Sequence, residues 1–288
     1  MFKINKLFQS FSSLALVSAA ILQTVAFCSS AAGAALIENG SFENWVITSG
    51  NKGVPVDWSK NLGSSKADLI RTSNIAGSSE GSGYAAVISA TSNLSTAVAS
   101  NNGKIEIGFV AAATDPGGTS NRSFNVILTQ VDSPSAGNDG LINIRASTSK
   151  TDASMLCLQA YDGVRWQLIA DELLPSVYDA DSNSFTTLNA YSFVLTLDLT
   201  AVEPSYSLSY GIVGGTMNTI SDIRFFWNQP TEGGISYLMF NGNTSATPFA
   251  VGEVYAIPEG NAVAAFGIAV ATTYLVTRRN KWLQVGRR

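Results

Sequence analysis

Apolar and polar residues alternate over long stretches of this chain. In residues 191–200 every second residue, from Tyr191 to Leu199, is aromatic or leucine, and most of the residues between them are polar. Residues 205–212 repeat the pattern after a short connection at 201–204. Because successive side chains of a β-strand point to opposite faces, this pattern predicts strands with one face on a core. It is typical of antiparallel sheets that face solvent on the other side.

Eight further segments predict strands of the same kind: 104–112, 123–131, 141–147, 154–161, 164–170, 222–227, 235–240 and 248–256. The pair Asp162-Gly163 between two of these segments predicts a hairpin. About a dozen strands exceed what one open sheet usually holds. No helical periodicity interrupts them, so we predict an all-β fold, an antiparallel β-sandwich or jelly roll over residues 35–256. Whether residues 35–100 form a separate unit stays open.

The N-terminus predicts a secretory signal peptide over residues 1–34. Lys3 and Lys6 precede a short apolar run at 14–22, and small residues lead to a cleavage site between Ala34 and Ala35. A lipid anchor on Cys28 is the alternative, which the large Phe27 before that cysteine disfavours. The pattern therefore indicates an exported protein.

The C-terminus, residues 257–288, carries a second targeting pattern. Pro258 and Glu259 are followed by an uncharged stretch, a predicted membrane helix at about 261–277, and then by Arg278 and Arg279. This order resembles the PEP-CTERM sorting signal of Gram-negative bacteria. The resemblance implies an exosortase-type partner, a transient inner-membrane anchor, and release to the cell surface or to an extracellular polysaccharide matrix. An ordinary tail anchor is the alternative.

The middle of the chain has a looser resemblance. Residues 36–45 with 55–58 resemble the start of secreted carbohydrate-binding sandwiches, and the strands at 164–170, 191–200 and 248–256 resemble concanavalin-like or laminin-G-like jelly rolls. The resemblance implies a lectin-like sandwich whose loops or concave face bind glycan.

Tryptophan is the residue type best suited to stack on a sugar ring. Trp58, in a loop context beside Asp57, is the first candidate for such a platform, and Trp227 with Asn228 is the second. The competing interpretation for every tryptophan is an ordinary place in the core.

Asp179, Asp181 and Asn183 offer oxygen ligands at alternate positions, as in a loop that wraps calcium. The EF-hand pattern fails because Ser184 and Ala190 stand where it needs glycine and glutamate. A solvated turn is the alternative, and the sequence indicates no other cofactor.

The amino-acid composition limits the kinds of catalytic and metal sites that the chain can form. The chain has no histidine, which excludes Ser-His-Asp triads and histidine-bearing zinc sites. It also lacks the Glu-x-Asp-x-x-Glu run of β-sandwich glycosidases. We therefore expect a non-enzymatic protein, with a secreted carbohydrate-active enzyme or a purely structural matrix protein as alternatives. Residues 35–258 have a net charge of about −10, which disfavours nucleic acid as a partner.

The two terminal patterns make one prediction. Mass spectrometry of the mature surface protein should find an N-terminus at Ala35 and a C-terminus near Pro258 or Glu259. A chain that ends at Arg288 in the membrane fraction would refute processing of the tail.

Overall fold

The computed structural model describes residues 37–59, 69–75, 83–89, 92–98, 103–118, 121–129, 140–200, 205–225, 234–242 and 247–258. The predicted signal peptide with its Ala34–Ala35 cleavage site, the tail with Glu259, Arg278 and Arg279, and the pair Trp227 and Asn228 lie outside these residues. Within the described ranges, no helix is long and apolar enough to cross a bilayer.

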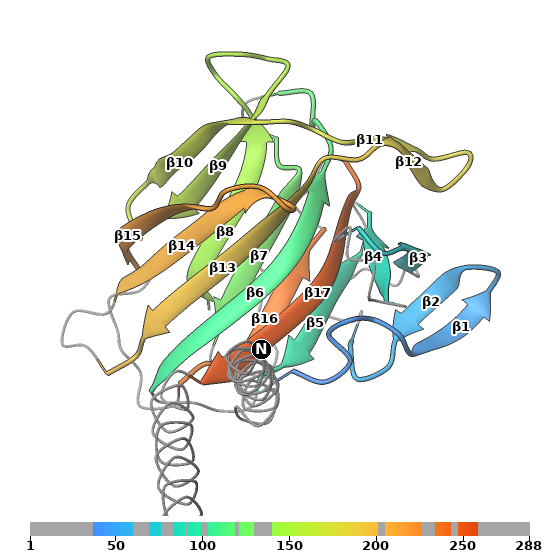
Figure 1. The fold of residues 1–288 in the computed structure, drawn as a ribbon, viewed down its shortest axis with the longest axis horizontal. Coiled ribbons are helices and arrows are strands. Elements are labelled where there is room, and N and C mark those ends of the chain that lie inside the picture. The colour runs from blue at the N-terminus through green and yellow to red at the C-terminus, as the bar shows by residue number, and fades with distance from the viewer. Residues whose placement is uncertain are drawn as a thin grey trace, which may run out of the picture. The chain divides into compact units, whose positions relative to one another are not determined.

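The strands form two large antiparallel sheets, which Figure 1 shows as overlapping layers. The nine-stranded sheet has the order β1 (Trp45–Ser49), β2 (Lys52–Pro55), β3 (Leu69–Ser73), β4 (Tyr84–Ile88), β17 (Phe249–Pro258), β6 (Lys104–Ala113), β13 (Ala190–Asp198), β14 (Ser205–Ile212) and β15 (Asn218–Arg224). The six-stranded sheet has the order β10 (Trp166–Leu173), β9 (Leu156–Tyr161), β8 (Gly140–Thr148), β7 (Phe124–Thr129), β16 (Tyr237–Asn241) and β5 (Asn93–Ala97). A small ribbon pairs β11 (Val177–Asp179) with β12 (Ser184–Thr187).

All ten segments predicted from alternation contain strands, and the all-β antiparallel class is confirmed. The predicted hairpin is also present: Tyr161 pairs with Trp166, and Gly163 has a positive φ of 91° in the loop. The Asp162 carboxylate accepts the backbone N–H groups of Val164 (2.8 Å) and Arg165 (2.7 Å), which closes the turn.

The seven strands β1 to β5, β11 and β12 were not predicted, because they are short and lack clear alternation. The N-terminal strands do not pack as a separate unit. β4 pairs with β17, the neighbour of β6, and β5 pairs with β16, so the described residues between 37 and 98 contribute to both sheets.

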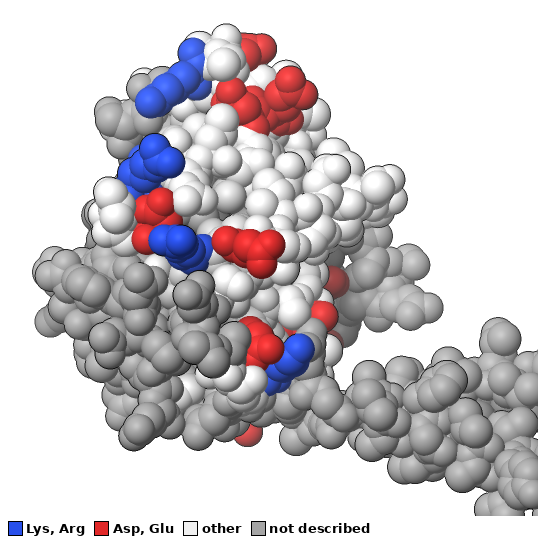
Figure 2. Space-filling view, turned by 90° about the vertical axis from the view of Figure 1, so that its left-hand side faces the viewer, with Lys and Arg blue, Asp and Glu red and all other residues white. Residues whose placement is uncertain are grey.

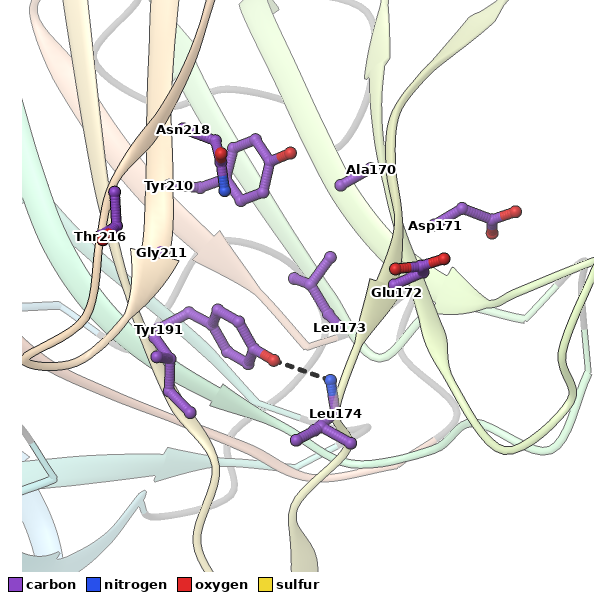
Figure 3. Close-up of a pocket in the computed structure, with 11 residues that line it drawn as sticks. Ala170, Asp171, Glu172, Leu173, Leu174, Tyr191, Tyr210, Gly211, Thr216 and Asn218 are labelled. Carbon is purple, nitrogen blue, oxygen red and sulfur yellow. Dashed lines mark hydrogen bonds between the residues drawn. The ribbon is translucent and has the colours of Figure 1, made fainter.

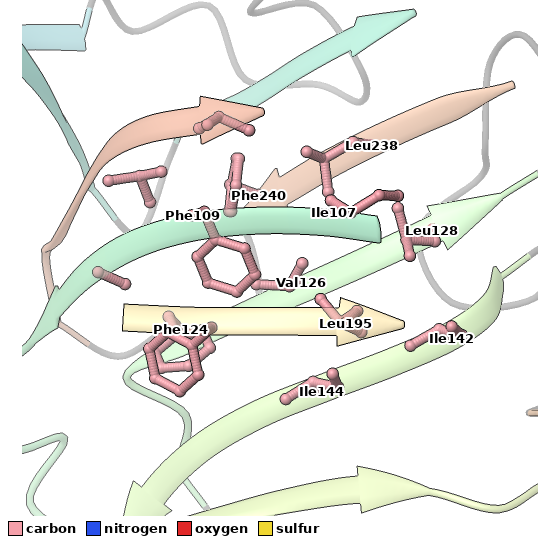
Figure 4. Close-up of a cluster of buried hydrophobic side chains, with 14 of the residues drawn as sticks. Ile107, Phe109, Phe124, Val126, Leu128, Ile142, Ile144, Leu195, Leu238 and Phe240 are labelled. Carbon is pink, nitrogen blue, oxygen red and sulfur yellow. The ribbon is translucent and has the colours of Figure 1, made fainter. Parts of the chain in front are cut away.

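A shared aromatic core joins the two sheets (Figure 4). The ring of Phe109 on β6 lies 5.1 Å from Phe193 on β13 and 5.3 Å from Phe240 on β16, measured between centroids. Phe124 on β7 meets Phe193 across the interface at 5.6 Å. All four side chains are at most 1% exposed. The apolar members of the alternating pattern are therefore the surfaces that hold the sandwich together.

A matched pair of leucines tests this assignment. Leu238 points into the core (Figure 4) and is fully buried, whereas Leu168 is 58% exposed. Leu238→Ala should lower the free energy of unfolding by about 2–5 kcal/mol through lost contacts and a residual cavity. Leu168→Ala should change it by no more than about 0.5 kcal/mol. Urea denaturation measures both, and equal effects would contradict the proposed core.

Candidate functional site

The structure corrects the prediction that Trp58 offers a platform for a sugar. Its side chain is 7% exposed and packs edge-to-face on Phe42, with ring centroids 4.9 Å apart. Its other neighbour is Phe240 at 6.2 Å, and its indole N–H donates to the carbonyl oxygen of Asn39 (3.2 Å). The indole ring and its N–H group thus both have partners inside the protein, and Trp58 is a core residue.

The predicted calcium ligands lie in the turn between β11 and β12. The Asp179 carboxylate accepts the backbone N–H of Asp181 (3.0 Å) and the hydroxyl of Ser182 (2.6 Å), and the Ser182 hydroxyl is the main cause that lowers the pKa of Asp179. Asn183 has a φ of 52° and accepts the Tyr178 hydroxyl (3.3 Å). These contacts are those of a turn closed by its own side chains. No cluster of three His, Cys, Asp or Glu side chains suited to a metal occurs among the described residues.

A pocket of about 590 Å³ opens between the edges of the two sheets, where β10 of one sheet meets β13, β14 and β15 of the other. Figure 2 looks onto the side of the molecule where β10 and β15 lie, and most of that surface is neither acidic nor basic. Figure 3 shows the residues from these strands that surround the pocket, with Tyr191, Tyr210 and Leu173 between the strands. They are Ala170, Asp171, Glu172, Leu173, Leu174, Tyr191, Tyr210, Gly211, Ile212, Thr216 and Asn218.

Two tyrosines form the aromatic part of this edge pocket. Tyr191 and Tyr210 share the inward parity of Phe193 and Leu208 on their strands, but they are only half-buried, at the rim of the core. The Tyr191 hydroxyl oxygen accepts the backbone N–H of Leu174 at 2.8 Å (Figure 3), which ties β13 to the segment after β10. The same alternation that builds the core therefore places two aromatic rings at its open edge.

Polar groups border the tyrosines. Asn218 pairs with Tyr210 and shares its face of the sheet, and Glu172 is exposed. Asp171 accepts the Thr151 hydroxyl (2.6 Å), and hydrogen bonds from Ser149 and then Thr151 lower the pKa of Asp171. Its carboxylate is therefore ionised at neutral pH. Asp171 and Glu172 are adjacent residues of β10.

This arrangement does not match a glycosidase acid pair. Such enzymes hold two carboxyl groups on either side of one bond, and one of them has a raised pKa. Asp171 and Glu172 are neighbours on a strand, where successive side chains diverge, and Figure 3 shows the Asp171 carboxylate pointing away from the tyrosines.

The tyrosine pair was missed in the sequence because alternation alone predicts both as core residues. Phe193 is covered by the opposite sheet, whereas the two tyrosines lie where that cover ends. Locating this point requires the register of β13 with β14, which the sequence pattern does not give.

The hydrogen bond at Tyr191 can be tested directly. Tyr191→Phe removes the acceptor for the Leu174 N–H, so amide exchange at Leu174 should accelerate by about 2- to 12-fold, the equivalent of ~0.5–1.5 kcal/mol. Tyr210→Phe is the matched control and should leave that rate unchanged. NMR-detected hydrogen exchange gives both values, and an unaltered rate in Tyr191→Phe would refute the contact.

The sequence matches no known family model and no curated protein. Similar solved structures include domain 4 of AbnA, a GH43 extracellular arabinanase from Geobacillus stearothermophilus, in complex with arabinotriose (12% identity, TM-score 0.40, 79% of this chain and 93% of that one). Another is the alginate lyase vAL-1 from Chlorella virus (8% identity, TM-score 0.39, 79% of this chain and 99% of that one). A third is the carbohydrate recognition domain of Emp47p (13% identity, TM-score 0.36, 75% of this chain and 93% of that one).

Proposed function

We propose that this chain is an exported surface or matrix protein that binds a glycan without cleaving it, and that the edge pocket holds a neutral sugar. The observation that carries the proposal is the half-buried pair Tyr191 and Tyr210, bordered by Glu172 and Asn218. Aromatic faces offer flat apolar surface to a sugar ring. Carboxylate and amide groups exchange hydrogen bonds with its hydroxyls.

The size and charge of the edge pocket support a neutral ligand. Its volume of about 590 Å³ falls within the range of roughly 300–1,000 Å³ that is usual for small-molecule sites. The carboxylate of Glu172 gives its border a negative charge, which disfavours acidic sugars through like-charge repulsion.

The half-buried rings of Tyr191 and Tyr210, which offer stacking surface to a sugar, support binding as the function of the pocket. A secreted carbohydrate-active enzyme remains the alternative function, and a purely structural matrix protein is the second alternative. The experiment below separates all three.

The export and sorting part of the proposal rests on the two terminal patterns. Its structural support is the position of Pro258, the last residue of β17, which pairs with Ile105 of β6. A cut near Pro258 and Glu259 leaves β17 within its sheet, so the sandwich keeps its central strand after release from the predicted membrane helix.

The purified full-length chain should be retained on at least one insoluble neutral polysaccharide without releasing reducing ends. Tyr210→Ala should weaken retention by about 10-fold, because an aromatic contact contributes up to ~1.5 kcal/mol beyond area burial. Tyr255→Ala is the matched control, since Tyr255 is 36% exposed and lies outside the pocket. Release of reducing ends would favour the enzyme, and no retention on any neutral glycan would favour the structural protein; either result contradicts the proposal.

A further inference from the structure

Two arginines and two aromatic rings gather on the outer face of the six-stranded sheet. On β8, Ile144 and Ala146 point into the core, so Arg145 between them points outward. Arg145 pairs with Gln159 on β9, and Tyr161 farther along β9 pairs with Trp166 on β10. We call Arg122, Arg145, Gln159, Tyr161 and Trp166 the arginine cluster.

Arg145 is fixed in place by its neighbours. Its Nε–H donates to the Gln159 side-chain oxygen at 2.8 Å, and its Cζ lies 3.9 Å from the centroid of the Trp166 ring. Tyr161 packs against the same indole, with centroids 5.2 Å apart. A guanidinium has five N–H donors, and the described residues accept a printed hydrogen bond only from the one on Nε. Toward the described part of the chain, the two terminal nitrogens therefore present a fixed fork of N–H groups.

A second guanidinium adds to this charge. Ser123 donates its backbone N–H to the Ala146 carbonyl oxygen (2.8 Å), which holds Arg122 close to Arg145. The Arg122 Cζ lies 5.6 Å from the Trp166 centroid. Both arginines are about half-buried, and burial followed by the charge of Arg122 lowers the pKa of Arg145 to about 10. Both remain charged at neutral pH.

Among the described residues, no carboxylate forms a resolved ion pair with either arginine. The ion pair resolved in the described part of the chain, Lys104 with Asp198, involves neither arginine. Residues 35–258 contain twice as many acidic as basic residues, so a structural ion pair could readily have formed. Two half-desolvated like charges with free N–H donors repel each other and favour an anion between or in front of them.

We propose that the arginine cluster binds the carboxylate of an acidic sugar in an extracellular polysaccharide. The planar fork of Arg145 matches the two oxygens of a carboxylate in a bidentate pair. The negative charge of the whole domain disfavours loose attraction of polyanions, so recognition must come from this local geometry. The site is distinct from the edge pocket, whose acidic border disfavours the same group.

The test is a calorimetric titration of the full-length chain with galacturonate oligomers, with their methyl esters and with inorganic phosphate. We expect binding of the acid and at least a tenfold weaker response to the ester and to phosphate. Arg145→Gln should weaken binding of the acid by about 10- to 100-fold, because a charge-assisted hydrogen bond contributes ~1.5–3 kcal/mol. The matched control Arg224→Gln removes an exposed arginine outside the cluster and should change affinity less than twofold.

Two further measurements keep the test decisive. If Arg145→Gln fails to fold, Arg122→Gln replaces it, and the shift of the Arg145 Nε–H NMR signal on titration of the unaltered chain reports the contact without any substitution. Three results would overturn the proposal: equal affinity for ester and acid, an equal loss of affinity in Arg145→Gln and in the control Arg224→Gln, or binding of phosphate as tight as that of the sugar acid. Retention on neutral glycan by Arg145→Gln tests the edge pocket separately, so the two sites can fail independently.

Discussion

The contact of aromatic rings across the two sheets is the interaction on which the structure depends. Phe109 and Phe193 from the nine-stranded sheet meet Phe240 and Phe124 from the six-stranded sheet in a buried interior. This contact requires every long strand to keep its apolar residues on one face. The alternation of apolar and polar residues in the sequence meets that requirement. Features at the margin of the sandwich follow from where this shared interior ends.

The edge pocket is such a margin. β13 and β14 extend beyond the part of their inner face that the other sheet covers. There Tyr191 and Tyr210 are half-buried beside the edge strand β10. The arginine cluster has a different origin, because Arg145, Gln159, Tyr161 and Trp166 lie on outward positions of β8, β9 and β10, and Arg122 precedes β7 beside them. The inward faces thus contribute stability, while the open edge and the half-buried arginines are the two places that we propose for binding.

The strands at 191–200 and 205–212 could be predicted because side-chain period is a local property of the sequence. The sites could not, since they depend on register and on what covers each face. The sequence favours Trp58 as the ligand platform, but Trp58 meets Phe42 and Phe240 in the core, whereas Trp166 lies on the outer face against Arg145. The pairing of Arg145 with Gln159 likewise needs the β8–β9 register.

The proposed binding of a neutral sugar depends on the edge pocket. The most direct measurement is a crystal structure of the chain with a neutral oligosaccharide from the polysaccharide that retains it. We predict a sugar ring against Tyr191 or Tyr210, with hydroxyls about 3 Å from Glu172 or Asn218. A sugar bound elsewhere on the sandwich, with the pocket unchanged, would contradict the account.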